Sequence, residues 1–126
     1  MKSEYVISRY KREAMYAFSL GYRVTESGFV VSPNNSGIKT HIRTKKSINK
    51  NDDLHFYKSS VFILNNCPTE EFGKSNYEIK VKHLAAIQLF GDAFYLNDMR
   101  VLYRDRNTTN NRLDNFTIEP SNRGDN

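Results

Sequence analysis

The feature that most constrains this chain is a polar loop between two short apolar runs near its end. The segment "VLYRDRNTTNNRLDNFTI" begins and ends with residues typical of strands and places Asp, Asn, Thr and Arg between them. Asp and Asn side chains bond nearby backbone amides and tolerate left-handed conformations. The pattern therefore predicts two strands joined by a self-braced loop. The residues predicted to shape that loop are Asn107, Asn110, Asn111, Asp114 and Asn115.

Helical and strand periodicities alternate through the rest of the chain. Apolar residues recur every three or four positions in residues 3–20, which predicts a helix with Lys11 on its solvent side. Residues 22–32 and 54–64 have the composition of strands, and residues 77–90 begin as a strand and continue as a helix. We therefore predict an α+β fold with an N-terminal helix and a small, mostly antiparallel sheet.

The length of 126 residues predicts a single domain over the whole chain. Within it we distinguish an N-terminal helix (1–21), a basic strand region (22–76) and the region of the polar loop (77–126). The single cysteine excludes an internal disulfide and is typical of a reducing compartment. No apolar run reaches the ~18 residues of a membrane helix, so we expect no membrane partner.

The charge is unevenly distributed along the chain. Residues 1–58 contain 11 Lys and Arg and five Asp and Glu, a net charge of +6, whereas residues 59–126 carry −1. A basic region of this kind favours a polyanionic partner, of which DNA and RNA are the commonest. The alternative is a solvated basic surface with no such partner.

Residues 37–50 contain no acidic residue and alternate between half-apolar and basic positions. On a strand, this alternation predicts Ile42 and Thr44 pointing inward and a basic row pointing outward. A basic strand face can follow a phosphate backbone, although lysines also protect edge strands from pairing. Together with two arginines of the polar loop, the predicted DNA-contacting residues are Lys39, His41, Arg43, Lys45, Lys46, Arg104 and Arg106.

Two segments together resemble the His-Me finger, the ββα metal motif of the small HNH homing endonucleases of phages and mobile introns. "VKHLAAIQLF" is similar to the helix before the finger, and "VLYRDRNTTNNRLDNFTIEPSNRGDN" is similar to the finger itself. The pattern D-x-N-x-x-N-N-R-L-D-N-F is its specific part. The resemblance covers residues 79–126, and residues 22–65 more loosely. It implies a C-terminal ββα unit in residues 77–126 with a truncated last helix.

The resemblance also implies a chemistry, and the chain departs from it at the base position. In the family, a histidine at the end of the first finger strand acts as general base on water. Here that position is Tyr103, whose phenol has a reference pKa near ~10 and is protonated at neutral pH. The histidine of the preceding helix aligns with Lys82, and the adjacent His83 is a possible substitute base.

The resemblance further implies one Mg²⁺ or Mn²⁺ ion on the scissile phosphate. Without gaps, the metal-holding asparagine of the finger helix aligns with Gly124. The candidate metal ligands are therefore Asp105, beside the base position, with Asn122 and Asn126 on either side of Gly124. A scaffold that is kept while its chemical positions change is the pattern of a degenerate active site.

These observations predict an HNH-endonuclease-like DNA-binding protein of phage or mobile-element type, with its nicking activity open. Double-stranded DNA is the expected partner, and the cytoplasm, that of the host cell if the protein is phage-encoded, is the expected location. The alternative is a catalytically dead finger that binds protein, as an anti-CRISPR-like inhibitor of a host nuclease or defence complex. A small α+β protein with an Asn-rich turn and no nuclease ancestry also stays open.

Overall fold

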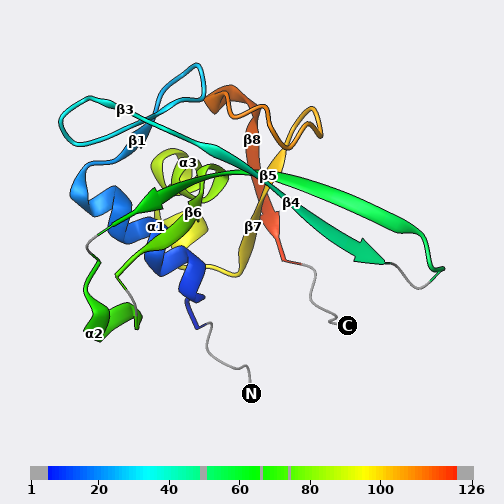
Figure 1. The fold of residues 1–126 in the computed structure, drawn as a ribbon, viewed down its shortest axis with the longest axis horizontal. Coiled ribbons are helices and arrows are strands. Elements are labelled where there is room, and N and C mark those ends of the chain that lie inside the picture. Colours follow the sequence, from blue (N-terminus) through cyan, green and yellow to red (C-terminus); the bar gives the residue numbers. More distant parts are fainter. Residues whose placement is uncertain (1–5, 49–50, 66, 74, 122–126) are drawn as a thin grey trace.

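Three small antiparallel sheets and two longer helices make up the structure (Figure 1). The computed structural model describes residues 6–48, 51–65, 67–73 and 75–121. The predicted α+β class is confirmed, with three small sheets in place of the expected one. None of the helices within the described residues combines the length and the apolar composition that a membrane crossing requires.

The two longer helices pack against each other over the core. Helix α1 (Arg9–Leu20) ends as predicted at Gly21, whose left-handed backbone has a φ of 107°. Its start is later than predicted, because Ser8 is extended. Helix α3 (Val81–Phe90) follows strand β6 (Tyr77–Lys80) without a loop, as the change of periodicity predicts.

Two short helices were not expected from the sequence. Helix α2 (Thr69–Phe72) lies in the connection that follows β5 (Leu54–Leu64), and α4 (Asp92–Tyr95) follows α3 after Gly91. Phe94 of α4 is fully buried. Four-residue helices carry too little periodicity to be seen in a sequence.

The prediction that Lys11 faces solvent is wrong. The residue is 1% exposed, and its Nζ donates hydrogen bonds to the carbonyl oxygens of Phe94, at 2.7 Å, and Asn97, at 2.8 Å. The aliphatic stem of a lysine can cross apolar surface while its ammonium reaches polar atoms. Here the ammonium lies 4.1 Å from the centre of the Phe94 ring and binds carbonyl groups around the end of α4.

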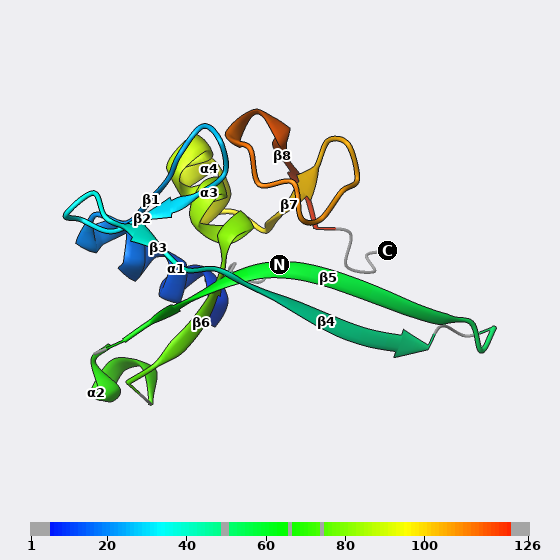
Figure 2. The same ribbon diagram turned by 45° about the horizontal axis from the view of Figure 1, so that its top comes forward.

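The first two sheets differ in the length of their strands. One consists of the short strands β1 (Arg23–Val24), β2 (Val30–Val31) and β3 (Gly37–Ile38). The other contains β4 (His41–Ile48), β5 and β6, in that order. Its β4–β5 hairpin extends away from the body of the molecule (Figures 1 and 2). We call the projecting part, residues 41–48 and 54–60, the arm.

The third sheet pairs β7 (Met99–Tyr103) with β8 (Phe116–Pro120). The connection between them, residues 104–115, ends in a 3₁₀ turn at Leu113–Asn115, and we call it the finger loop after the resemblance noted in the sequence. These are the two strands expected on either side of the polar loop. The helix expected after them would begin at Ser121, and residues 122–126 lie outside the described residues.

One continuous core joins the three sheets to the helices. Its fully buried side chains include Phe62 of β5, Leu84 of α3, Phe94 of α4 and Phe116 of β8. The finger loop is therefore carried on strands anchored in the same core as the arm. Arm and finger loop form two projections of one packed body, and in Figure 2 the loop stands over the arm.

Candidate nucleic-acid interface

The finger loop is built around the carboxylate of Asp105. Its Oδ1 accepts hydrogen bonds from the backbone N–H of Asn107 at 2.8 Å and from Asn115 Nδ2 at 2.9 Å. Its Oδ2 accepts from Asn110 Nδ2 at 2.7 Å. These donors favour the charged form, so Asn110 first, then Asn107 and Asn115, lower the pKa of Asp105.

Asn115 closes the loop from the other end and is itself buried. Its Oδ1 accepts from the backbone N–H of Asp105 at 3.1 Å, and its Nδ2 also donates to the Asn110 carbonyl at 2.9 Å. The structure thus brings Asp105, Asn107, Asn110 and Asn115 into one hydrogen-bond network. The conformation of the loop depends on these bonds among its own side chains and backbone.

Two other residues predicted to shape the loop lie outside this network. Asn111 has its Oδ1 buried with no hydrogen-bond partner among the described residues, and its backbone lies against Gly28 of the β1–β2 turn. Asp114 is exposed and pairs with Arg112 at 3.4 Å. Of the five residues predicted to shape the loop, Asn107, Asn110 and Asn115 therefore belong to the network, whereas Asn111 and Asp114 do not.

Tyr103, at the position where the resemblance implies a base, is packed as an apolar side chain. Its ring centre lies 5.2 Å from that of Phe116, and Lys82 Nζ lies 6.0 Å from the ring. Burial raises the pKa of Tyr103 to about 12. The phenol is therefore protonated at neutral pH and does not accept a proton from water.

His83, the possible substitute base, faces another part of the molecule. Its ring centre lies 4.3 Å from that of Tyr10 on α1, in a hollow that Glu13 and Lys80 also line. Burial, followed by the charges of Lys82, Lys80 and Lys11, lowers its pKa well below the usual value. The imidazole is neutral, but the structure does not bring it to Tyr103.

The described residues around Tyr103 do not fit a divalent metal ion. Mg²⁺ and Mn²⁺ prefer free carboxylate oxygens in near-octahedral geometry. Both oxygens of Asp105 already accept from amide donors, and no cluster of three or more His, Cys, Asp or Glu side chains occurs within the described ranges. The other two candidate ligands, Asn122 and Asn126, lie outside the described residues.

Two adjoining pockets lie between the arm, α3 and the finger loop. The first, of about 360 Å³, is lined by Lys82, Tyr103, Arg106 and Thr108 with two apolar residues of β7. The second, of about 480 Å³, shares Arg106 and Thr108 and reaches the arm. We call the pair the basic cleft, and no carboxylate from the described residues lines it. Besides Arg106 and Thr108, the second pocket is lined by Phe56, Tyr57, Lys58, Asn107 and Thr109.

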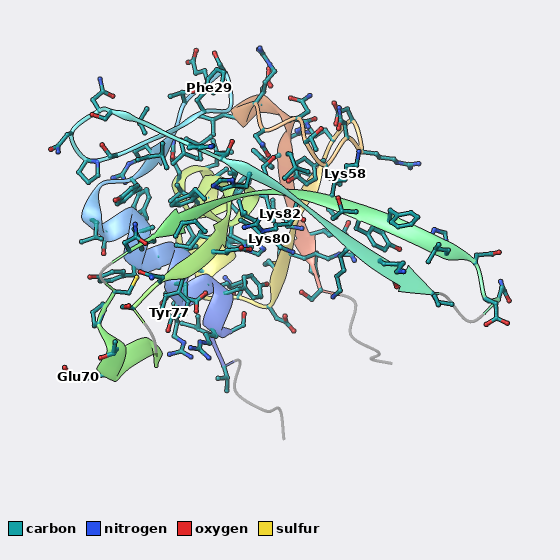
Figure 3. All side chains as sticks on the ribbon, viewed as in Figure 1. Phe29, Lys58, Glu70, Tyr77, Lys80 and Lys82 are labelled. Carbon is teal, nitrogen blue, oxygen red and sulfur yellow. The ribbon has the colours of Figure 1, made fainter. Side chains whose placement is uncertain are left out.

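Three cations from three elements converge on the basic cleft. Lys58 projects from β5, Lys82 from the first turn of α3, and Arg106 from the finger loop (Figure 3 labels the two lysines). Arg106 has a left-handed backbone with a φ of 64°, a conformation uncommon outside glycine and asparagine. Across the described part of the chain, none of the three belongs to an ion pair.

The basic residues of β4 and its surroundings do not form the single DNA-contacting row that the sequence predicts. His41, Arg43 and Lys45 share one face of the arm, but Arg43 forms an ion pair with Glu78 of β6 at 2.6 Å. Lys46 lies on the opposite face because side chains alternate along a strand. Lys39 and Arg104 are exposed and lie outside both pockets of the basic cleft.

The prediction that Ile42 points inward is wrong. The residue is 51% exposed, and among the described residues the pairing of β5 with the third strand, β6, begins only at Val61. Alternation along a strand predicts which residues share a face, but not whether that face is covered. Both faces of the arm are therefore open to a partner.

Lys58 and Lys82 were missed as candidate contact residues. Lys58 is the one charged residue of a run whose composition predicts only a strand. Lys82 occupies a position where the resemblance implies a histidine. The signal that identifies Lys58 is its cross-strand pairing with Thr44, which places it on the face that continues into Phe62 and the core. That register cannot be read from the sequence.

No protein-family model, curated protein or solved structure matches this chain.

Proposed function

We propose that this chain binds duplex DNA in the basic cleft. It would be an HNH-like protein whose finger serves as a scaffold and in which Tyr103 does not act as the general base for DNA cleavage. The observation that carries the proposal is the convergence of Lys58, Lys82 and Arg106 on a cleft without a carboxylate. Phosphate contacts of this kind supply most of the affinity of non-specific DNA binding.

The electrostatics of the cleft support an anionic ligand. Lys82 is half-buried, and burial, followed by the charge of Lys80, lowers its pKa. A phosphate beside it would favour its charged form and offset the repulsion among the cations. Arg106 supplies a planar donor suited to a phosphate oxygen pair, and Lys58 supplies a point charge from the opposite side.

The resemblance of residues 79–126 to the HNH finger supports DNA as the polyanion. The same segment argues against catalysis by the family mechanism. Tyr103 is protonated, and Asp105 is engaged in shaping the loop. Binding uses the cations of the basic cleft, whereas for cleavage the described residues supply neither base nor metal ligand set.

A duplex-binding titration at several salt concentrations tests the proposal. We expect wild-type protein to bind, and the Lys58→Gln/Arg106→Gln variant to bind more weakly with a smaller salt dependence. Each lost phosphate contact lowers the slope of log affinity against log salt by ~0.9, so the pair lowers it by up to roughly 1.8. The matched control is Arg12→Gln, an exposed cation of α1 outside the cleft. Equal slopes for the two variants would overturn the proposal.

A plasmid-nicking assay with Mg²⁺ or Mn²⁺, run on the same samples, separates the remaining functions. Binding without nicking is expected. Nicking by the wild type would instead identify an active HNH-type nickase whose base is not the Tyr103 phenol.

A protein partner is the second candidate, and one observation favours it. Large apolar side chains of the arm, among them Ile48 and Phe56, are exposed to solvent. Such patches mark interaction sites of either kind. If the protein neither binds nor nicks DNA while it stays folded, inhibition of a host nuclease or defence complex becomes the leading function.

A further inference from the structure

We propose that the arm inserts the apolar pair Ile48 and Leu54 between stacked base pairs and bends the duplex. The inference rests on the proposed DNA binding and adds how the arm engages its ligand. Ile48 and Leu54 face each other as the outermost cross-strand pair of the hairpin. They are 65% and 50% exposed, and Phe56, one step inward on the same face, is 61% exposed.

The apolar pair lies on the face of the arm that turns toward the basic cleft. Residues Leu54, Phe56 and Lys58 alternate along β5 on the side that continues into the buried Phe62. Phe56 and Lys58 line the cleft beside the finger loop. A duplex held by the cleft cations therefore meets the face that ends in Ile48 and Leu54.

The charges around the pair favour a polyanion as the occupant of this face. Neither strand of the arm contains an acidic residue. Lys46 pairs with Phe56, one step inward from Ile48 and Leu54 on the same face, whereas Lys45 pairs with Tyr57 on the opposite face. Lys46 and Lys58 are therefore the cations of this face that can contact phosphates beside the base step.

The acids of the hairpin turn limit how the arm approaches. Asp52 and Asp53 lie beyond the apolar pair, at the end of the hairpin. Phosphates repel them, so the turn itself is not the contact. The contact is made by the face of the ribbon, with the turn held outside the groove.

The arm is long enough to reach across a duplex groove. Eight residues of β4 at ~3.4 Å each span roughly 27 Å. Proteins that push apolar side chains between base steps do so from the minor groove and kink the duplex by about 20–90°. Pyrimidine–purine steps unstack most readily, so they are the expected sites.

The test uses the full chain and a short duplex whose single TA step carries 2-aminopurine and whose ends carry a fluorescence energy-transfer pair. Wild-type binding is expected to raise the 2-aminopurine fluorescence, because the base unstacks, and to bring the duplex ends closer. The Ile48→Ser/Leu54→Ser variant is expected to lose both signals and to keep the salt dependence of binding. The matched control is Leu96→Ser, a 51% exposed apolar residue that follows α4.

The outcomes separate this inference from the proposed function. No binding by the wild type overturns both. Binding without a rise in 2-aminopurine fluorescence, or with a rise that the double variant keeps, overturns the wedge and leaves DNA binding standing. Sedimentation velocity measures whether the wild type and the double variant self-associate. If the wild type self-associates, and the double variant is monomeric with unchanged DNA signals, the apolar face is a protein interface and the wedge is overturned.

Discussion

Asp105 and Asn115 exchange two hydrogen bonds across the finger loop. The backbone N–H of Asp105 donates to Asn115 Oδ1 at 3.1 Å, and Asn115 Nδ2 donates to Asp105 Oδ1 at 2.9 Å. The exchange ties the first residues of the loop to its last and sets the backbone on which Arg106 is presented to the cleft. Loop stability and ligand contact therefore depend on the same two residues.

Replacing Asn115 with Ala is expected to lower the free energy of unfolding by about 2 kcal/mol, since the backbone groups of Asp105 and Asn110 in these part-buried hydrogen bonds lose their partners. Asn111→Ala is the matched control from the same loop. Its Oδ1 has no partner within the described residues, so a change below about 0.5 kcal/mol is expected. Urea denaturation of both variants measures the difference. Equal destabilisation would show that the Asp105–Asn115 exchange does not hold the loop.

The pH dependence of stability should report Asp105. Its pKa is lower in the folded protein than the 3.8 of a free side chain, so the unfolded chain takes up the proton first as pH falls. The stabilisation is therefore complete above pH 3.8 and is lost as pH falls through the folded pKa. Denaturation of wild type and Asp105→Asn between about pH 2 and 5 should give curves that converge at low pH. Parallel curves would contradict this assignment.

Gly28 holds the β1–β2 turn against the finger loop. It has a φ of 95°, and a Cβ at this position would lie 2.7 Å from the carbonyl carbon of Asn111. Gly28→Ala is expected to destabilise the protein by about 3 kcal/mol, from backbone strain and overpacking together. Gly37→Ala, where nothing lies within 4 Å, is the control for thermal denaturation. Similar melting temperatures for the two variants would refute the close approach.

The order of the elements is predictable because periodicity is local. The run that becomes β5 and the switch from strand to helix at Lys80 and Val81 follow from neighbouring residues alone. The burial of Lys11 is not predictable in this way, since its acceptors lie 83 and 86 residues further along the chain. The exposure of Ile42 likewise depends on what covers the arm.

The same distinction applies to the candidate site. Composition predicts that the loop braces itself, because Asp and Asn bond nearby amides. It does not reveal that Asp105 is the centre or that Asn111 is left out. The basic cleft is less predictable still, since Lys58, Lys82 and Arg106 come from three elements that only the packing brings together.

Lys11→Met tests the buried ammonium. The substitution keeps the apolar stem but leaves the carbonyls of Phe94 and Asn97 without this donor, so a loss of about 3 kcal/mol is expected. Arg12→Met, at the next and exposed position, should change the free energy of unfolding by less than about 0.5 kcal/mol. Chemical denaturation measures both. If Lys11→Met had the same free energy of unfolding as the wild type, the ammonium would make no net contribution to stability.

Tyr103 provides the sharpest test of the finger's chemistry. Because its pKa is about 12, Tyr103→Phe should leave any nicking rate unchanged. Tyr103→His supplies a base with a reference pKa near ~6.5, but nicking is not expected from this change alone, since Gly124 stands where the resemblance implies a metal-holding asparagine. The resemblance implies that Gly124→Asn restores a metal ligand, so the Tyr103→His/Gly124→Asn variant should nick plasmid DNA with Mn²⁺. Tyr103→Phe/Gly124→Asn is its matched control. If the histidine variant stays folded, binds DNA and still does not nick, the finger has no metal site to restore and acts as a scaffold alone.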